Sequence, residues 1–193
     1  MSKPVIPIFI TGNQNKADYL SRQLGIGIEH QKVELDEIQS VDLHTIVAHK
    51  LRQAYNVVQK PVLVEDVSLE FNALSGLPGP FIKWFVEYAG EEACCRILDG
   101  FDDKSAVIKC TFGYYDGRNM EFFDSVSHGT ISDYPRGENG FGFDAFFIND
   151  GYDVTRAEMS QEENERTYAE TMKPFAKVRS FLLSQPDTTS KDI

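Results

Sequence analysis

The chain has 193 residues, of which 41% are hydrophobic and 25% are charged, and its formal net charge is −11. This length suits one sizeable hydrophobic core rather than two domains, and the composition is typical of a soluble globular protein. The acidic balance argues against a protein that grips long nucleic acids, which needs a basic surface, although a few lysines and a metal ion could still hold a small anion.

The sequence also bears on the compartment. No apolar run is long enough to span a bilayer, and the first residues lack the basic-then-apolar layout of a signal peptide. The three cysteines are an odd number, and Cys94 and Cys95 are adjacent, with no Cys or His pair at zinc-ligand spacing. We therefore expect a cytoplasmic protein with no membrane contact and no zinc site.

The N-terminal segment predicts a strand, a turn and a helix. Residues 5–11 form an apolar run, in which Pro7 is expected to make the early part irregular. A glycine turn follows, and Asn13 can cap a helix whose apolar residues recur at helical spacing. The turn has neither the spacing of a P-loop nor the further glycines of a dinucleotide fingerprint.

The next segments predict a strand over 28–35, a helix over 42–58 and a central buried strand over 61–71 that ends in acids. Asp42 stands at the start of that helix, where a carboxylate is favourable. Residues 76–85 carry two glycines and two prolines, which predict a rigid turn, with Pro80 as the first residue of a helix.

The C-terminal half predicts a short helix near residues 91–98 and then two long strands joined at Asp116-Gly117, a strong hairpin signal. A glycine-rich loop, a short strand and a helical region over 160–183 follow, with a break expected at Pro174. Together these elements predict an α/β protein with one elongated domain over 1–184, a mixed central sheet and flanking helices in two lobes, while the polar tail 185–193 is expected to be disordered.

Three segments could carry chemistry, because ligands of α/β sheets bind beyond the carboxyl ends of strands. The first is the turn at Thr11, Gly12, Asn13 and Lys16, where a helix start and a lysine suit an anion. The alternative interpretation is a capped helix with a solvated lysine.

The second segment is Glu65-Asp66, two adjacent carboxylates in a buried strand. One should point to each face of the sheet, and each is costly there unless it is paired or bound to a metal. A capping role is the alternative. Because one carboxylate makes a poor magnesium site, Glu37 is a candidate second ligand, although alone it would resemble surface charge.

The third segment contains Phe141, Gly142, Phe143 and Asp144. Aromatic residues with glycine in a loop offer a stacking platform for a planar base, and the alternative is a pair of core aromatics that anchor the loop. Lys50 is a lone lysine, and taken singly such a residue is more often solvated than functional.

Four motifs in order resemble the inosine triphosphatase family of nucleotide pyrophosphatases: TGNQNK, VEDVSLEFNALSGLPGPFIKWF, GFGFD and YDVTRAEMSQEE. The resemblance covers about residues 5–183. It implies an elongated α/β fold with a deep nucleotide-binding cleft between two lobes, and a homodimer. It also implies Mg²⁺-dependent hydrolysis, with Mn²⁺ as a substitute, of ITP, dITP or XTP to monophosphate and pyrophosphate.

The resemblance also assigns roles to residues of this chain. Thr11, Gly12, Asn13 and Lys16 match a phosphate-binding turn, and Lys50 matches a phosphate-contacting lysine. Glu37 and Asp66 match metal ligands, and Asp66 also matches the general base. The base-binding segment corresponds to Phe141, Gly142, Phe143 and Asp144.

One part of the family pattern is missing. The family usually continues after Ala-Glu-Met into a segment with a lysine and then Ser-His-Arg, which helps to hold the base and the phosphates. Here the lysine position falls on Asn164, and the Ser-His-Arg positions fall on Tyr168, Ala169 and Glu170. Either the substrate has changed, or activity is weaker, or Arg166 or Lys173 replaces the lost groups.

These observations leave two hypotheses of different class. The first is a nucleoside triphosphate pyrophosphatase with altered or relaxed base choice. The second is a catalytically weak nucleotide-binding protein on the same scaffold, which would not need the hydrolytic carboxylates Glu37 and Asp66.

Overall fold

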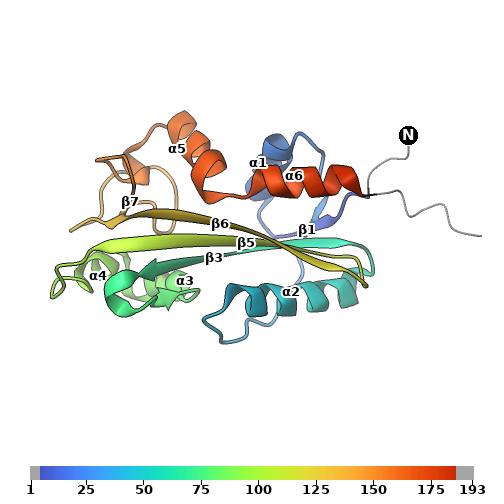
Figure 1. Cartoon of the computed structure of the whole chain (residues 1–193), viewed down its shortest axis with the longest axis horizontal. Helices are drawn as coiled ribbons and strands as arrows, with labels where there is room; N and C mark the ends of the chain where they lie inside the picture. The colour runs from blue at the N-terminus through green and yellow to red at the C-terminus, as the bar shows by residue number, and fades with distance from the viewer. Residues whose placement is uncertain (1–4, 186–193) are drawn as a thin grey trace, which may run out of the picture.

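A mixed sheet of seven strands runs through the molecule (Figure 1), in a computed structural model that describes residues 5–185. The strands are β1 (Ile8–Ile10), β2 (His30–Gln31), β3 (Val62–Phe71), β4 (Pro78–Gly79), β5 (Ser105–Tyr115), β6 (Met120–Ile131) and β7 (Phe147–Asn149). Their order is β2-β1-β3-β5-β6-β7, and β4 pairs with β3 off this path. β1 is parallel to β2 and to β3, whereas the remaining pairs are antiparallel, so the expected mixed sheet is confirmed.

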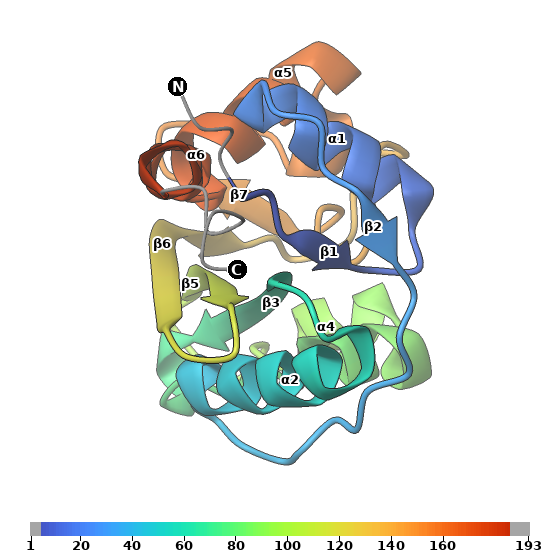
Figure 2. The ribbon, with the colours of Figure 1, turned by 90° about the vertical axis from the view of Figure 1, so that its right-hand side faces the viewer.

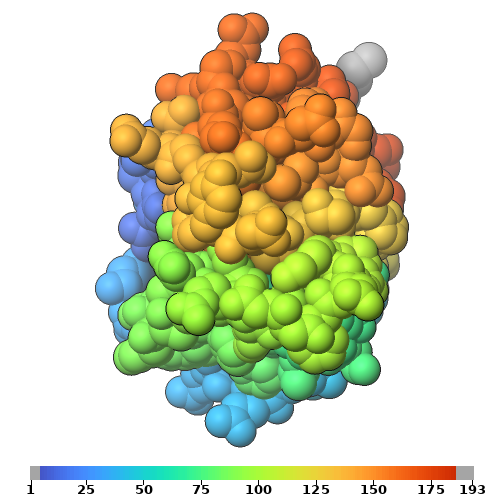
Figure 3. All heavy atoms as spheres, turned by 90° about the vertical axis from the view of Figure 1, so that its left-hand side faces the viewer, coloured from blue at the N-terminus to red at the C-terminus, as the bar shows by residue number. Residues whose placement is uncertain are grey.

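Helices cover both faces of this sheet. The helices are α1 (Gln14–Leu24), α2 (Leu43–Val58), α3 (Ile82–Trp84), α4 (Glu91–Arg96), α5 (Gln161–Thr167) and α6 (Phe175–Ser184), with π turns η2 (Phe85–Ala89) and η4 (Tyr168–Met172) and short 3₁₀ turns η1 (Asn72–Leu74) and η3 (Arg156–Glu158). α1, α5 and α6 lie on one face, and α2, α3 and α4 lie on the other (Figures 1 and 2). Far from the termini, residues of the α5 region lie above the α3 and α4 region (Figure 3).

Local signals place the two long helices where the sequence predicts them. Asn13 caps α1, and its side chain accepts a hydrogen bond from the Lys16 amide at 3.1 Å. Asp42 caps α2, and its carboxylate accepts from the Thr45 amide at 3.0 Å. Each side chain satisfies a helix-end donor that would otherwise be unpaired.

The core lies on both sides of the central strands. Phe9, Leu20 and Phe112 belong to the cluster beneath α1 and α6, while Val47 and Leu51 of α2 pack on the opposite face. Gly113 of β5 permits this second contact, because a Cβ there would overlap the side chains of Val47 and Leu51. Close packing of this kind leaves no room for an added methyl group.

The expected hairpin and the expected break at Pro174 are confirmed, since β5 and β6 flank residues 116–119 and α6 begins at Phe175. Two boundaries differ. The strand expected over 28–35 covers only His30–Gln31, and the helix expected from Pro80 begins at Ile82.

A third difference matters for function. β3 continues five residues past Asp66 to Phe71, because its second half pairs along its length with β5. The extent of the strand predicted over 61–71 is confirmed, and only the expectation that it ends in the acids is wrong, because Glu65 and Asp66 lie in its middle.

The tail expected to be disordered, 185–193, lies outside the described residues except for Gln185. Among residues 5–185, no helix combines the length and the apolar character needed to cross a membrane.

Candidate functional site

A cleft of about 1730 Å³ opens between the helical layers, beside the middle of β3. The short β1 pairs with β3 only at Val62 and Leu63, and the next partner on that side, β4, pairs at Leu69 and Glu70. Both faces of β3 can therefore be reached from the gap beyond β1. The cleft is lined by residues from the α1 turn, the segment before α2, the α3 region, the 139–144 loop and α5.

On the α1 side of β3, Glu65 holds two lysines. Its Oε2 lies 2.8 Å from Lys16 Nζ, and its Oε1 is paired with Lys173 Nζ, which also lies 3.6 Å from the Cys110 thiol. Burial alone would raise the pKa of Glu65, but the ammonium groups of Lys16 and Lys173 outweigh burial and lower this pKa to about 2. The cluster carries one net positive charge, and the Lys16 side chain is 42% exposed to the cleft.

On the α2 side of β3, Asp66 and Glu37 converge on Lys50. Lys50 Nζ lies 2.7 Å from Asp66 Oδ2 and 3.4 Å from Glu37 Oε1. The other Asp66 oxygen accepts from the Val67 amide at 2.9 Å, which fixes the carboxylate. Burial tends to lower the pKa of Lys50, but Asp66 and Glu37 outweigh it and raise that pKa. The alternation of side chains along β3 thus sends the two neighbouring acids to opposite layers, as expected.

The Glu37 and Asp66 pair fits a divalent metal ion by the chemistry of its donors. Two carboxylates from separate segments already share one cation, the Lys50 ammonium. Mg²⁺ is typically held by one or two carboxylates together with waters and substrate phosphates. Within the part of the chain that the structure describes, no group of three acidic, His or Cys residues could form a complete protein cage for a metal.

The expected phosphate turn also borders the cleft, through Thr11, Asn13 and Lys16. Thr11 Oγ1 accepts from the Asn13 amide at 3.1 Å, and Asn13 in turn caps α1. Gly12 faces the side-chain stem of Lys32, since a Cβ on Gly12 would lie 3.1 Å from Lys32 Cδ. Helix capping and an exposed lysine coexist here, so the structural and the functional interpretations of this turn are compatible.

The segment expected to bind the base splits into two environments. Both aromatic residues border the cleft, but Phe141 is 75% exposed, whereas Phe143 is partly buried and packs against the core cluster that contains Phe146. Gly142, between them, has a φ of +66°, a conformation that favours glycine. Phe141 is therefore available for stacking, and Phe143 behaves as the anchoring aromatic of the alternative interpretation.

Asp144 is fully buried, and protein donors surround its carboxylate. Tyr168 donates its hydroxyl to this carboxylate at 2.9 Å, the Phe141 amide donates at 3.1 Å, and Arg156 Nε lies 3.1 Å away. Burial raises the pKa of the Asp144 carboxyl, and the Arg156 guanidinium opposes that effect. The one carboxylate of the segment expected to bind the base is thus already engaged within the protein.

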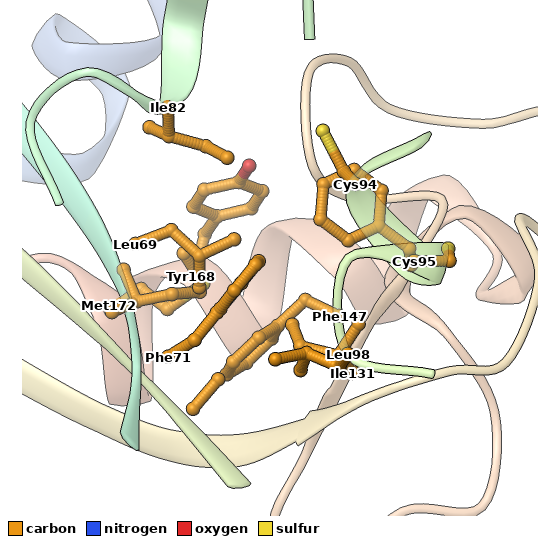
Figure 4. Close-up of a cluster of buried hydrophobic side chains, with 13 residues drawn as sticks. Leu69, Phe71, Ile82, Cys94, Cys95, Leu98, Ile131, Phe147, Tyr168 and Met172 are labelled. Atoms are coloured by element: carbon orange, nitrogen blue, oxygen red, sulfur yellow. The ribbon is translucent and has the colours of Figure 1, made fainter. Parts of the chain in front are cut away.

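The region that lacks Ser-His-Arg contains a buried aromatic residue, and one of the two cations proposed as replacements lies near it. Tyr168 is 9% exposed and packs among Leu69, Ile82 and Met172 (Figure 4). Arg166 is exposed and lies outside the cleft lining, whereas Lys173 lines the cleft beside Glu65. Of the two cations considered as replacements, only Lys173 is near the expected site.

The sequence points to Glu65 only as the neighbour of Asp66, and it does not identify Arg156 as a residue of the site. The sequence did carry a signal for the ion pairs of Glu65, because a carboxylate in a buried strand needs a partner. Arg156 gave no such signal, because it follows a loop in a polar stretch and yet is fully buried.

The chain is similar to known proteins over most of its length. A model described as the Ham1 family matches residues 7–172. The chain is 40% identical over 185 residues to an inosine triphosphate pyrophosphatase of Yarrowia lipolytica, covering 93% of this chain and 97% of the relative. It is 42% identical over 160 residues to the protein of the same name from Candida albicans, covering 82% and 78%.

Solved structures show the same fold. The Ham1 protein of Staphylococcus aureus has a TM-score of 0.78 at 22% identity, covering 91% of this chain and 96% of that one. A HAM1 protein from Coxiella burnetii has a TM-score of 0.77 at 22% identity, covering 92% and 98%.

Proposed function

The chain belongs to the Ham1 family, and from that premise we propose that it hydrolyses non-standard purine nucleoside triphosphates such as ITP, dITP and XTP to monophosphate and pyrophosphate. The names of relatives that match nearly the whole chain support this proposal. The structural observation that carries it is the convergence of Lys16, Lys50, Glu37 and Asp66, from four separate segments, on one cleft.

The roles follow from position and charge. Lys16, exposed to the cleft, would bind the phosphate chain and stabilise charge that develops on the leaving pyrophosphate. Asp66 would accept a proton from the water that attacks the α-phosphorus, as the bond to the α–β bridging oxygen breaks. Phe141 would stack on the base.

Glu37 and Asp66 would hold a divalent metal ion, which we propose to be Mg²⁺, with Mn²⁺ as a substitute. When bound, the ion would neutralise part of the negative charge on the phosphates of the substrate. In the structure Lys50 bridges the two carboxylates. With the metal ion in that place, the Lys50 ammonium would be free to turn toward a phosphate.

Base choice is proposed to be altered or relaxed. The Ser-His-Arg positions hold Tyr168, Ala169 and Glu170, and the Asp144 carboxylate is bonded within the protein. With fewer free charged groups near Phe141, fewer contacts can distinguish one base from another.

A nucleotide panel tests the proposal. Pyrophosphate release from ITP, dITP, XTP, ATP and GTP would be measured with Mg²⁺, and Asp66→Asn is expected to lower kcat by roughly 10²–10⁴-fold with the fold intact. The matched control is Glu70→Gln, which also removes a carboxylate of β3 from a lysine, Lys109 at 2.7 Å, but lies outside the cleft lining. Binding without release by the unaltered protein would favour the weak nucleotide-binding protein instead.

Two further proposals come from the resemblance alone, a homodimer and a cytoplasmic location. Analytical ultracentrifugation of the full chain and imaging of a tagged chain in cells would test them.

A further inference from the structure

Arg156, the first residue of η3, is a buried charged residue with a defined set of contacts. Its side chain has no solvent exposure, its Nε lies 3.1 Å from Asp144 Oδ1, and its guanidinium carbon lies 3.5 Å from the centre of the Tyr168 ring. Its Nη2 donates to Asn164 Oδ1 at 2.6 Å. A buried guanidinium is costly unless it is paired, so these contacts hold its position.

The contact with Arg156 fixes how the Asn164 amide points. A guanidinium can only donate hydrogen bonds, so the amide oxygen must face it and the Nδ2 group must face away. Asn164 is 7% exposed and lines the cleft, and within residues 5–185 no protein acceptor bonds its Nδ2. The amide therefore presents an unused donor at the cleft wall.

This donor lies near the place that best suits a planar ring. Asn164 and Tyr168 both line the cleft and are four residues apart, about one helical turn. The Tyr168 ring is nearly parallel to the exposed Phe141 ring, with an angle of 11° and 6.3 Å between centroids. A base that stacks on Phe141 would have its edge within reach of this part of α5.

We propose that Asn164 is a specificity-determining residue, whose Nδ2 donates to a keto oxygen on the edge of the bound base, and that Arg156 is the positioning residue that sets the direction of the amide. The inference rests on the proposed function and names the chemistry of its base recognition. A keto purine meets a donor at this position, whereas an amino purine would place its own donors against it. A single neutral amide would thus supply one contact that favours keto purines, fewer contacts than the Ser-His-Arg segment provides.

The test uses binding first, so that it does not depend on turnover. Calorimetric titration of the full chain with inosine 5′-monophosphate and with purine riboside 5′-monophosphate, which lacks the keto oxygen, gives a ratio of affinities. Asn164→Asp keeps the shape and the bond to Arg156 but replaces the donor with an acceptor. We expect the ratio to fall by about tenfold or more.

Gln161→Glu is the matched control, because it makes the same amide-to-carboxylate change on the cleft side of the same helix without a contact to Arg156. It should weaken both ligands alike and leave their ratio unchanged. Arg156→Met, checked by thermal melting, should lower the ratio as Asn164→Asp does, without a matching loss of affinity for purine riboside monophosphate.

An unchanged ratio in Asn164→Asp would overturn the inference, as would an equal fall of the ratio in the Gln161→Glu control. Failure of the unaltered protein to release pyrophosphate from any nucleotide would count against the proposed function alone. The affinity ratio would still decide the role of Asn164.

Discussion

Replacing Glu65 with Gln should remove a pH-dependent part of the stability of the fold. The pKa of Glu65 is lowered from 4.5 to about 2 in the folded protein, so its ionised form stabilises the fold above the unfolded pKa. This difference corresponds to about 3 kcal/mol, of which about 2 kcal/mol is lost by pH 3 as the carboxylate of the unfolded chain takes up its proton. The stability advantage of wild type over Glu65→Gln should therefore shrink by that amount.

Urea unfolding followed by circular dichroism at pH 7, 5, 4 and 3 measures this advantage directly. The control is Glu34→Gln, because Glu34 is 87% exposed in its pair with Lys32, and an exposed pair contributes about 0–1 kcal/mol. The control should show almost no change with pH. A wild-type advantage over Glu65→Gln that stays constant from pH 7 to pH 3 would refute the ion-pair argument.

Three further predictions concern the cleft and the core. Lys16→Ala should weaken binding of a triphosphate more than of a monophosphate, because its ammonium faces the expected phosphate chain; equal losses in calorimetric titrations would contradict this placement. Gly113→Ala should destabilise the fold by about 1–3 kcal/mol in urea unfolding, since the added methyl meets Val47 and Leu51. Values of kcat/KM for ITP and ATP should differ less than in a relative with Ser-His-Arg, and an equally strong preference for ITP would show that other groups have replaced it.

Much of the fold could be predicted because its signals are local. The apolar face of α2, the caps at Asn13 and Asp42, and the Asp116-Gly117 turn each depend on residues within a few positions of one another. Element boundaries were less predictable where tertiary pairing decided them. The strand expected over 28–35 covers only His30–Gln31, because β1 pairs with it only at Phe9 and Ile10, and no pattern within residues 28–35 indicates how short that partner is.

The sequence by itself determined that two adjacent acids would point to opposite faces of β3, because side chains alternate along any strand. Only the tertiary structure decided their partners. Lys173 meets Glu65 across 108 positions of sequence, and Tyr168 meets Asp144 across 24. Periodicity reports which face of its own element a residue occupies. The charge that a buried group meets depends instead on how separate elements pack, and this packing brings Lys16, Lys173 and Glu65 together in the wall of the cleft.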